Sequence, residues 1–203
     1  MNSEYLFEYA NHFETVLAVA YEKGYSLFAL EKLISYSKYF QYIESDKTSY
    51  PPITTDEQLI KGIFPELKVN LATVNSYNQC LWVAESYLRI QGATGLTFEC
   101  IFLYIPISKM YEYFLLYHEM DFSHIVNEFK RLFSLKSALE ILLDKYGYSL
   151  QDISSRIEIP YDTLHSLKKR RRDIKKLSVE SVVKLAKVFN VRVETIAEIS
   201  IQK

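Results

Sequence analysis

Long stretches without glycine or proline constrain this chain more than any other feature of its sequence. Only five glycines and five prolines occur among its 203 residues, whereas loop-rich and all-β proteins use both residues repeatedly in their turns. Within the uninterrupted stretches, apolar side chains recur at helical spacing, as they do from Leu6 to Ala20. We therefore predict an all-α protein.

Charged and aromatic residues divide the chain into two parts. Residues 1–133 contain 10 lysines and arginines against 16 aspartates and glutamates, whereas residues 134–203 contain 14 against 9. Fourteen of the 17 tyrosines and the single tryptophan precede residue 134. This asymmetry indicates two domains with different partners, an acidic, aromatic-rich one over residues 1–133 and a basic one over residues 134–203.

Helical periodicity predicts six or seven helices in residues 1–133. The expected helices cover residues 4–19, "LFALEKLISYSKYF" after Ser26, a short segment after a Thr55–Gln58 capping box, Thr73–Gln91 ended by Gly92, "LTFECIFLYI", Ser108–Tyr117, and a segment capped by Ser123 that continues to Phe133. "LTFECIFLYI" also fits a buried strand, but an isolated strand has nothing to pair with. Residues 44–55, "ESDKTSYPPITT", are expected to form an exposed loop because they contain two consecutive prolines.

The sequence lacks signals for secretion or membrane insertion. The N-terminus carries acidic residues and no apolar signal core, and no run of about 18 apolar residues occurs. Cys80 and Cys100 belong to no metal-binding or redox pattern, which predicts small buried side chains rather than metal ligands or a disulfide. We expect a cytoplasmic protein without a membrane segment.

One cluster of ionisable residues, "YHEMDFSH" from Tyr117 to His124, raises the question of a metal site. A metalloprotease needs HExxH, which places two histidines on one helical face. Here His118 and His124 lie six positions apart across an expected helix break, so a junction between two helices is the better interpretation. His12 is expected to lie alone on its helix, and no nucleotide-binding or nucleophile motif occurs. We predict no enzyme activity, no catalytic or metal-binding residues and no cofactor.

The last third of the chain predicts a helix-turn-helix domain. Its expected helices are "LKSALEILLDKYG", with Leu135, Ala138, Leu139 and Leu142 facing the core and Gly147 at its end; "LQDISSRI", capped by Ser149; "YDTLHSLKK", with Leu164 and Leu167 inward; "SVESVVKLAKVF", capped by Ser178; and "VETIAEI". "EIP" is a turn because Pro160 cannot continue a helix but can begin one. Two short helices joined by such a turn, with one helix before and two after, are typical of this motif.

Residues 134–199 resemble the five-helix DNA-binding domain of the Xre/Cro-repressor type, found in phage repressors and many bacterial regulators. The resemblance lies in "YSLQDISSRIEIPYDTLHSLKKRRRDIKKLSVESVVKLAKVFNVRVETI". Four positions depart from the family's pattern: Leu150 replaces a phosphate-binding glutamine, Ser154 stands at the helix crossing, and Glu158 and Arg170 replace two glycines. If the backbone at Glu158 or Arg170 keeps a positive φ, each costs about 1 kcal/mol. The alternative is that the two turns differ slightly from those of the family.

The resemblance implies that the helix "YDTLHSL" lies in the major groove of DNA, with its N-terminal residues against base edges. The residues expected to face the bases are Tyr161, Asp162, His165, Ser166 and Lys169. Lysine can bond guanine acceptors, aspartate can accept from a cytosine amino group, and serine can do either.

A basic run follows this helix, since seven of the nine residues from Lys168 to Lys176 are lysine or arginine. The expected phosphate contacts are Ser149, Gln151, Lys168, Arg170, Arg171, Arg172, Lys175 and Lys176. If roughly five phosphates are neutralised, a plot of the logarithm of DNA affinity against the logarithm of salt concentration should have a slope of about −4 to −5. A charge run alone is usually a solvated face, so the alternative is a domain of this type that has lost DNA binding and contacts proteins instead.

The segment "LWVAESYLRIQGATGLTFECIFLYIPISKMYEYFLLYHEMD" is similar to accessory domains of small regulators and antitoxins from bacterial mobile elements. With the aromatic-rich composition, this implies that residues 1–133 mediate homodimerisation or bind a protein partner, such as a toxin or a host factor. We expect a transcriptional regulator that binds double-stranded DNA as a homodimer, an autorepressor or antitoxin of a toxin–antitoxin or mobile-element operon. The alternative is a protein-binding inhibitor or adaptor, antitoxin-like or anti-defence, that acts through residues 1–133.

Overall fold

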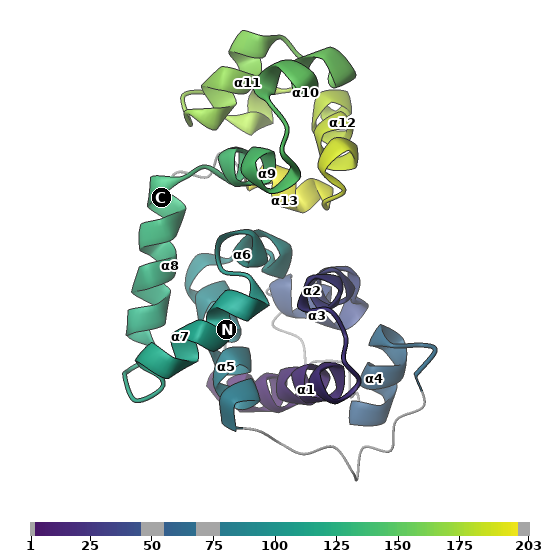
Figure 1. Ribbon diagram of the computed structural model, residues 1–203, viewed down its shortest axis with the longest axis vertical. Helices are drawn as coiled ribbons and strands as arrows, with labels where there is room; N and C mark the ends of the chain where they lie inside the picture. Colours follow the sequence, from purple (N-terminus) through teal and green to yellow (C-terminus); the bar gives the residue numbers. More distant parts are fainter. Residues whose placement is uncertain (1–2, 46–54, 68–77, 199–203) are drawn as a thin grey trace. The chain divides into compact units, whose positions relative to one another are not determined.

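The computed structural model describes residues 3–45, 55–67 and 78–198, and within these ranges the chain forms helices and no strands (Figure 1). The all-α prediction is therefore confirmed. The chain divides into two compact units, residues 1–128 and residues 129–203. None of the helices in the described ranges combines the length and the apolar character that a membrane span requires.

The described part of unit 1 is built from seven helices and the first residues of an eighth. Their bounds are α1 (Ser3–Glu22), α2 (Leu27–Tyr36), α3 (Lys38–Glu44), α4 (Asp56–Ile63), α5 (Asn78–Thr94), α6 (Phe98–Tyr104), α7 (Ile107–Tyr117) and α8 (Ser123–Leu135), which contains the boundary between the units. α1 packs against α5 and α4, and α2 packs against α3, α6 and α7.

Aromatic side chains fill the centre of unit 1. The fully buried ring of Phe13 contacts Phe40, Tyr87 and Phe98, with ring centroids 4.7, 5.9 and 5.9 Å away. The Tyr87 hydroxyl donates to the Ile105 carbonyl at 2.8 Å, so its one polar atom is satisfied inside the core. Much of the aromatic content of this unit is therefore explained by its core.

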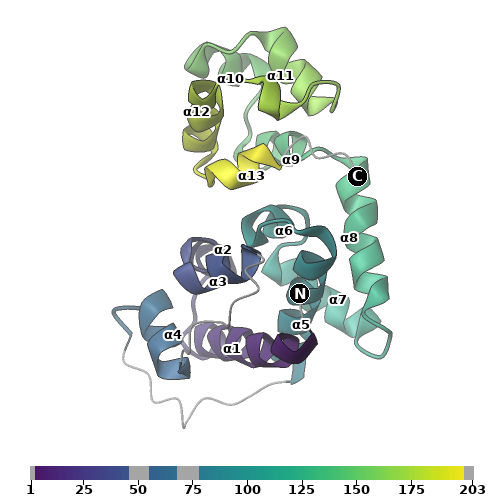
Figure 2. The ribbon, with the colours of Figure 1, turned by 180° about the vertical axis from the view of Figure 1, so that it is seen from behind.

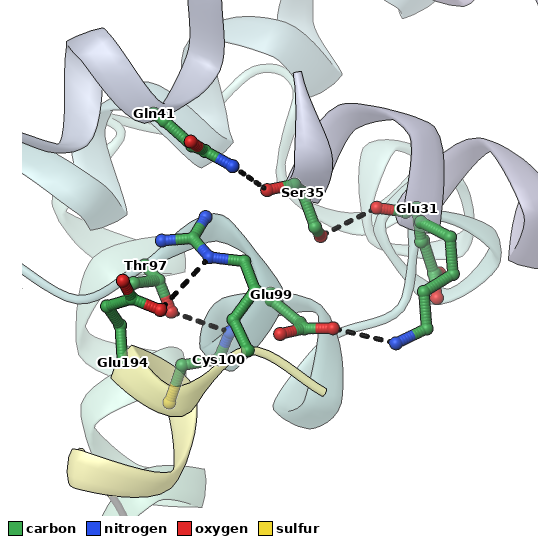
Figure 3. A network of polar contacts seen from close by, with 9 residues as sticks. Glu31, Ser35, Gln41, Thr97, Glu99, Cys100 and Glu194 are labelled. Atoms are coloured by element: carbon green, nitrogen blue, oxygen red, sulfur yellow. Dashed lines mark hydrogen bonds and ion pairs between the residues drawn. The ribbon is translucent and has the colours of Figure 1, made fainter. Parts of the chain in front are cut away.

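Acidic side chains satisfy helix N-termini inside this unit. The half-buried Glu44 accepts a hydrogen bond from the Phe98 N–H at the start of α6, at 2.6 Å. Buried Glu31 likewise accepts from the Ile107 N–H at the start of α7, at 2.8 Å. Figure 3 shows other polar contacts of Glu31 and Glu99, and buried Glu99 accepts a hydrogen bond from the Lys32 ammonium at 2.7 Å. The first N–H groups of a helix have no partner within the helix, so such carboxylates stabilise both termini.

Two predicted helices of unit 1 differ from the observed ones. The segment expected to be one helix after Ser26 is interrupted at Ser37, whose backbone is extended (φ −69°, ψ 129°), giving α2 and α3. The helix expected to end at Gly92 continues to Thr94, and Gly95 follows it with φ +68°. Its expected start at Thr73 and most of the loop predicted at residues 44–55 lie outside the described residues.

Other local predictions for unit 1 are confirmed or shifted by a residue or two. The Thr55–Gln58 capping box is present, and "LTFECIFLYI" contains a helix, α6, rather than a strand. α7 begins directly after Pro106 rather than at Ser108. Ser123 is the first residue of α8, and its N–H donates to the Asp121 carboxylate at 2.8 Å, so Asp121 caps this end instead.

Unit 2 contains the remaining helices of the described chain (Figure 2). They are α9 (Ala138–Tyr146), α10 (Leu150–Ile157), α11 (Tyr161–Lys168), the short 3-10 helix η2 (Ile174–Lys176), α12 (Val179–Phe189) and α13 (Val193–Ala197). α10 packs against α11 and α12, α9 against α11, and α13 against α12. Its fully buried side chains include Leu142, Ile153, Leu164, Leu167, Leu185, Phe189 and Ile196.

The prediction for the first helix of this unit was wrong at Leu135. This residue ends α8 and is 65% exposed, whereas it was expected to face the core at the start of the next helix. Ser137 separates the two helices, since its backbone is extended and its side chain accepts a hydrogen bond from the Glu140 N–H. A good N-cap residue so close to the expected start explains why the new helix begins after it.

Candidate nucleic-acid interface

The two helices α10 and α11 are joined by a tight turn whose backbone is held locally. Ser149 and Asp152 form a complete capping box at the start of α10, as the Ser149 N-cap predicted. α10 ends at Ile157, and the N–H of the next residue, Glu158, donates to the Ser154 carbonyl at 3.1 Å. The Ser154 hydroxyl donates to the Ile159 carbonyl at 2.7 Å. α11 then begins directly after Pro160.

Both positions that lack the family's glycines have left-handed backbone conformations. The φ angle is +57° at Glu158 and +53° at Arg170. These two turns therefore keep the geometry that glycine normally supplies, and each side chain costs about 1 kcal/mol in this conformation. Of the two alternatives that the sequence left open, a positive φ is the one observed at both sites.

The helix α11 has one apolar face and one accessible face. Leu164 and Leu167 are fully buried, as predicted. The five residues expected to face DNA bases lie elsewhere on the helix: Tyr161, Asp162 and Lys169 are exposed, and His165 and Ser166 are half-buried. None of the five belongs to the buried core.

Helical spacing arranges these residues in two adjacent rows. Tyr161, His165 and Lys169 are four residues apart, so they follow one another along one side of the helix. The rings of Tyr161 and His165 stack with an interplanar angle of 15° and centroids 6.1 Å apart. Asp162 and Ser166 form the neighbouring row. The first two turns of α11 thus bring two stacked rings beside a carboxylate and a hydroxyl.

The residues expected to contact phosphates differ in what surrounds them. Gln151, Arg171 and Lys176 are exposed. Lys168 lies 3.6 Å from the Glu140 carboxylate on α9, and the Arg172 guanidinium donates to the Thr163 hydroxyl on α11 at 3.1 Å. The side chain of Lys175 lies outside the described part of the structure.

Ser149 uses its hydroxyl within the capping box. The hydroxyl donates to the Asp152 carboxylate at 2.6 Å and accepts from the Asp152 N–H at 3.1 Å. The hydrogen bonds from the Ser149 hydroxyl and from its backbone N–H hold the pKa of Asp152 below its usual value. The charged carboxylate lies at the helix N-terminus, where negative charge is favourable, and the phosphate contact expected at Ser149 stays a prediction.

Arg170 differs most from its expected role. Its guanidinium donates to the carbonyls of Phe133, Ser134 and Lys136, at the end of α8 and just beyond it. The same group lies 5.1 Å from the centroid of the Phe133 ring. These carbonyls engage guanidinium donors in the free protein, and the phosphate contact expected at this position stays a prediction.

The sequence did not predict one group of polar side chains that come together in unit 1. His12 was expected to lie alone, but its Nδ1 is 2.5 Å from the Tyr39 hydroxyl on α3 and its Nε2 is 3.8 Å from the Asp56 carboxylate on α4. Burial raises the pKa of the Tyr39 hydroxyl, with further contributions from Tyr9, Glu8 and Asp56. These partners are 27 and 44 positions away in the chain, so no local pattern indicates them.

The cluster at Tyr117–His124 forms the junction between two helices. α7 ends at Tyr117, and His118 Nδ1 lies 2.8 Å from the Phe114 carbonyl one turn earlier. Cys80 and Cys100 are both buried, and neither forms a disulfide. Nowhere in the described ranges do three or more histidine, cysteine, aspartate or glutamate side chains come together as metal ligands would.

A buried scaffold that leaves one short helix and a following basic segment accessible defines a DNA-binding helix-turn-helix domain. Residues 138–200 match the family of Cro/C1-type HTH DNA-binding domains. The C-terminal unit is thus a helix-turn-helix domain of the Xre/Cro type, as its sequence indicated. No curated protein and no solved structure matches the chain.

Proposed function

We propose that this protein is a sequence-specific transcriptional regulator that represses the operon encoding it. The observation that carries the proposal is the Cro/C1-type domain at residues 138–200, whose helix α11 keeps its polar face accessible. In proteins of this motif the second helix enters the major groove and the flanking residues contact the backbone.

In this mechanism α11 distinguishes bases through its two rows of side chains. Asp162 accepts from an exposed cytosine amino group, Lys169 donates to guanine acceptors, and Tyr161 packs on a thymine methyl group or bonds a phosphate. The exposed Gln151, Arg171 and Lys176 then contact phosphates, which provide affinity and register but no base preference.

The role of unit 1 in this proposal is to join two chains and to bind a protein partner. Support comes from α7 and the turn that follows it, where Leu115 is 73%, Leu116 63% and Met120 49% exposed. Large apolar side chains in such positions are common at protein interfaces. As an antitoxin, the protein would neutralise a toxin through unit 1 and repress the toxin operon through unit 2.

Electrophoretic mobility shift on the protein's own promoter tests this proposal. We expect a shift that excess random duplex does not compete away, with an affinity that falls steeply as salt rises. His165→Ala should lower affinity for the promoter about tenfold and barely change binding to random duplex. Equal affinity for both duplexes in the wild-type protein would contradict sequence-specific regulation.

The exposed apolar residues of α7 favour a second candidate, a protein-binding inhibitor or adaptor. A full-length chain with His165→Ala and Lys169→Ala separates the two candidates, because both changes lie on the accessible face of α11. If the doubly substituted chain has lost promoter binding but retains its cellular effect, the function belongs to unit 1. If the effect is lost together with promoter binding, the regulator is the correct assignment.

A further inference from the structure

The basic segment after α11 contains three consecutive arginines in three different environments. Arg171 is exposed, Arg172 bonds to Thr163, and Arg170 bonds to three carbonyls near the end of α8. Their sequence neighbourhood is nearly the same, so their environments are set by the fold. The three arginine side chains can therefore differ in what they contribute when α11 binds DNA.

The backbone of Arg170 ends the helix α11. Its N–H donates to the Leu167 carbonyl at 2.9 Å, and the N–H of Arg171 donates to the Ser166 carbonyl at 2.8 Å. With φ +53° at Arg170, this is the hydrogen-bond pattern of a Schellman motif, in which glycine is usual at this position. The backbone conformation therefore directs the Arg170 side chain away from the path that a continued helix would follow.

The side chain of Arg170 caps a second helix. The distances from its guanidinium to the Lys136 and Ser134 carbonyls are 2.6 and 3.4 Å, and it also donates to the Phe133 carbonyl. The last carbonyls of a helix have no intrahelical partner and carry partial negative charge, so a cation there is favourable. The forked geometry of arginine allows one side chain to reach several acceptors.

Neighbouring ion pairs strengthen the same connection. Lys168, the last residue of α11, lies 3.6 Å from Glu140 on α9, and Lys136 bonds to Asp144 on α9 at 2.9 Å. The end of α11, the end of α8 and the first turns of α9 are thus joined by contacts within unit 2. A displacement of Arg170 would loosen the end of the helix that carries Lys169.

We propose that Arg170 is a positioning residue, which holds the end of α11 against the end of α8, while its exposed neighbours Lys169, Arg171 and Lys176 contact DNA. This inference rests on the proposed function of α11 in reading DNA. A positioning residue affects discrimination between sequences, because base contacts depend on the exact placement of the helix. A phosphate-binding residue affects all duplexes alike and changes the salt dependence.

The experiment compares the full-length wild type with Arg170→Gly, Arg170→Lys and Arg171→Ala. Glycine keeps the left-handed turn and removes the guanidinium. Lysine keeps the charge but lacks the fork, so it serves a phosphate contact well and the three carbonyls poorly. Arg171→Ala is the matched control, because it removes an exposed charge from the next position.

Fluorescence anisotropy over a salt series would use two labelled duplexes, one from the region upstream of the protein's own gene and one of random sequence. We expect Arg170→Gly and Arg170→Lys each to lower affinity for the upstream duplex about tenfold. The slope of log affinity against log salt concentration should stay unchanged in both variants. Arg171→Ala should instead lower the slope by about one on both duplexes. Thermal unfolding would set a temperature at which every variant is folded.

Two results would overturn the role of Arg170. One is wild-type affinity in Arg170→Lys together with a slope lowered by about one in Arg170→Gly, which identifies a phosphate contact. The other is unchanged affinity and selectivity in both variants. If the wild-type chain itself binds neither duplex, the proposed function fails and this role fails with it, which is a distinct outcome from a change confined to the variants.

Discussion

At the scale of single residues, the accessible face of α11 depends on what lies beneath it. Leu164 and Leu167 are fully buried, and they lie on the face of this short helix opposite the two rows of polar side chains. A helix of eight residues is too short to be stable by itself in water, so the burial of these two leucine side chains holds α11 against the rest of unit 2. The accessible side chains can be exchanged at little cost in stability, whereas the leucines cannot.

Leu164→Ala is therefore expected to lower the free energy of unfolding by about 2–5 kcal/mol, because it removes a buried side chain and leaves a cavity. Denaturation by urea, followed by circular dichroism, measures this change. Val179→Ala is the control, since Val179 is 79% exposed and its truncation should change stability by less than about 0.5 kcal/mol. Equal effects of the two changes would show that Leu164 is not part of the core.

At the scale of elements, the four helices α9 to α12 of unit 2 are each ended by a left-handed residue, but only one of these is glycine. Gly147, Glu158, Arg170 and Asn190 have φ of +65°, +57°, +53° and +49°. Asparagine tolerates this conformation better than most residues, whereas glutamate and arginine do not. The turn between α10 and α11 therefore stores strain that the surrounding packing overcomes.

Glu158→Gly should raise the free energy of unfolding by about 0.5–1 kcal/mol by relieving this strain. The change also removes a surface contact in which Lys184 lies 3.4 Å from the Glu158 carboxylate. Glu158→Ala is the matched control, since it removes the same carboxylate but keeps the Cβ atom. The difference between the two variants in urea denaturation isolates the backbone effect, and no difference would argue against strain at this turn.

The capping box at the start of α10 predicts a pH dependence. The pKa of Asp152 is lowered chiefly by the hydrogen bond from the Ser149 hydroxyl, and then by the one from the Ser149 N–H. A carboxyl group whose pKa is lower in the folded state stabilises the protein at pH values above its unfolded pKa of about 3.9. This stabilisation is lost as the pH falls through the pKa of the folded state. Unit 2 should accordingly lose stability in acid through this group.

Ser149→Ala should raise the pKa of Asp152 toward its usual value and reduce this acid-dependent loss. The variant should also be less stable at neutral pH by about 1 kcal/mol, because it lacks the N-cap. An NMR titration of the Asp152 carboxyl group measures the first effect, and thermal unfolding from pH 3 to 7 measures the second. Ser178→Ala removes the N-cap of α12, so it should leave the Asp152 titration unchanged; a shift there would contradict the assignment.

At the scale of the whole molecule, the two units carry opposite charge. Lys130 and Arg131 belong to unit 2, so residues 1–128 contain 8 basic against 16 acidic residues and residues 129–203 contain 16 against 9. The acidic unit is unsuited to contact phosphates, whereas the basic unit attracts them. The charge difference therefore supports the proposal that DNA binding and partner binding belong to different units of the chain.

A dimer is the expected form of the protein on DNA. Sedimentation equilibrium should give about twice the mass of the 23.9 kDa chain. Footprinting should then reveal two half-sites whose centres are about 10 base pairs apart or a multiple of that spacing. Inserting about five base pairs between them should abolish tight binding, since it rotates one half-site by half a turn. Tight binding that survives the insertion, or a monomeric mass, would refute this arrangement.

The sequence by itself determined the all-α class, the helix-turn-helix and most of the helix ends in unit 2. These features depend on neighbours a few positions apart: Ser149 caps its own helix, Gly147 ends its own helix, and Leu164 and Leu167 share one face by spacing alone. The break at Ser37 was missed because no glycine or proline marks it.

Only the tertiary structure decided which basic residues remain available to DNA and which polar residues meet in unit 1. Arg170 contacts carbonyls more than 30 positions earlier in the chain, and His12 meets side chains from two later helices. Such contacts form when distant helices pack together, so they leave no periodic trace in the sequence. The run of lysines and arginines shows how much positive charge is present, but the fold determines which of these side chains face solvent and which contact other residues.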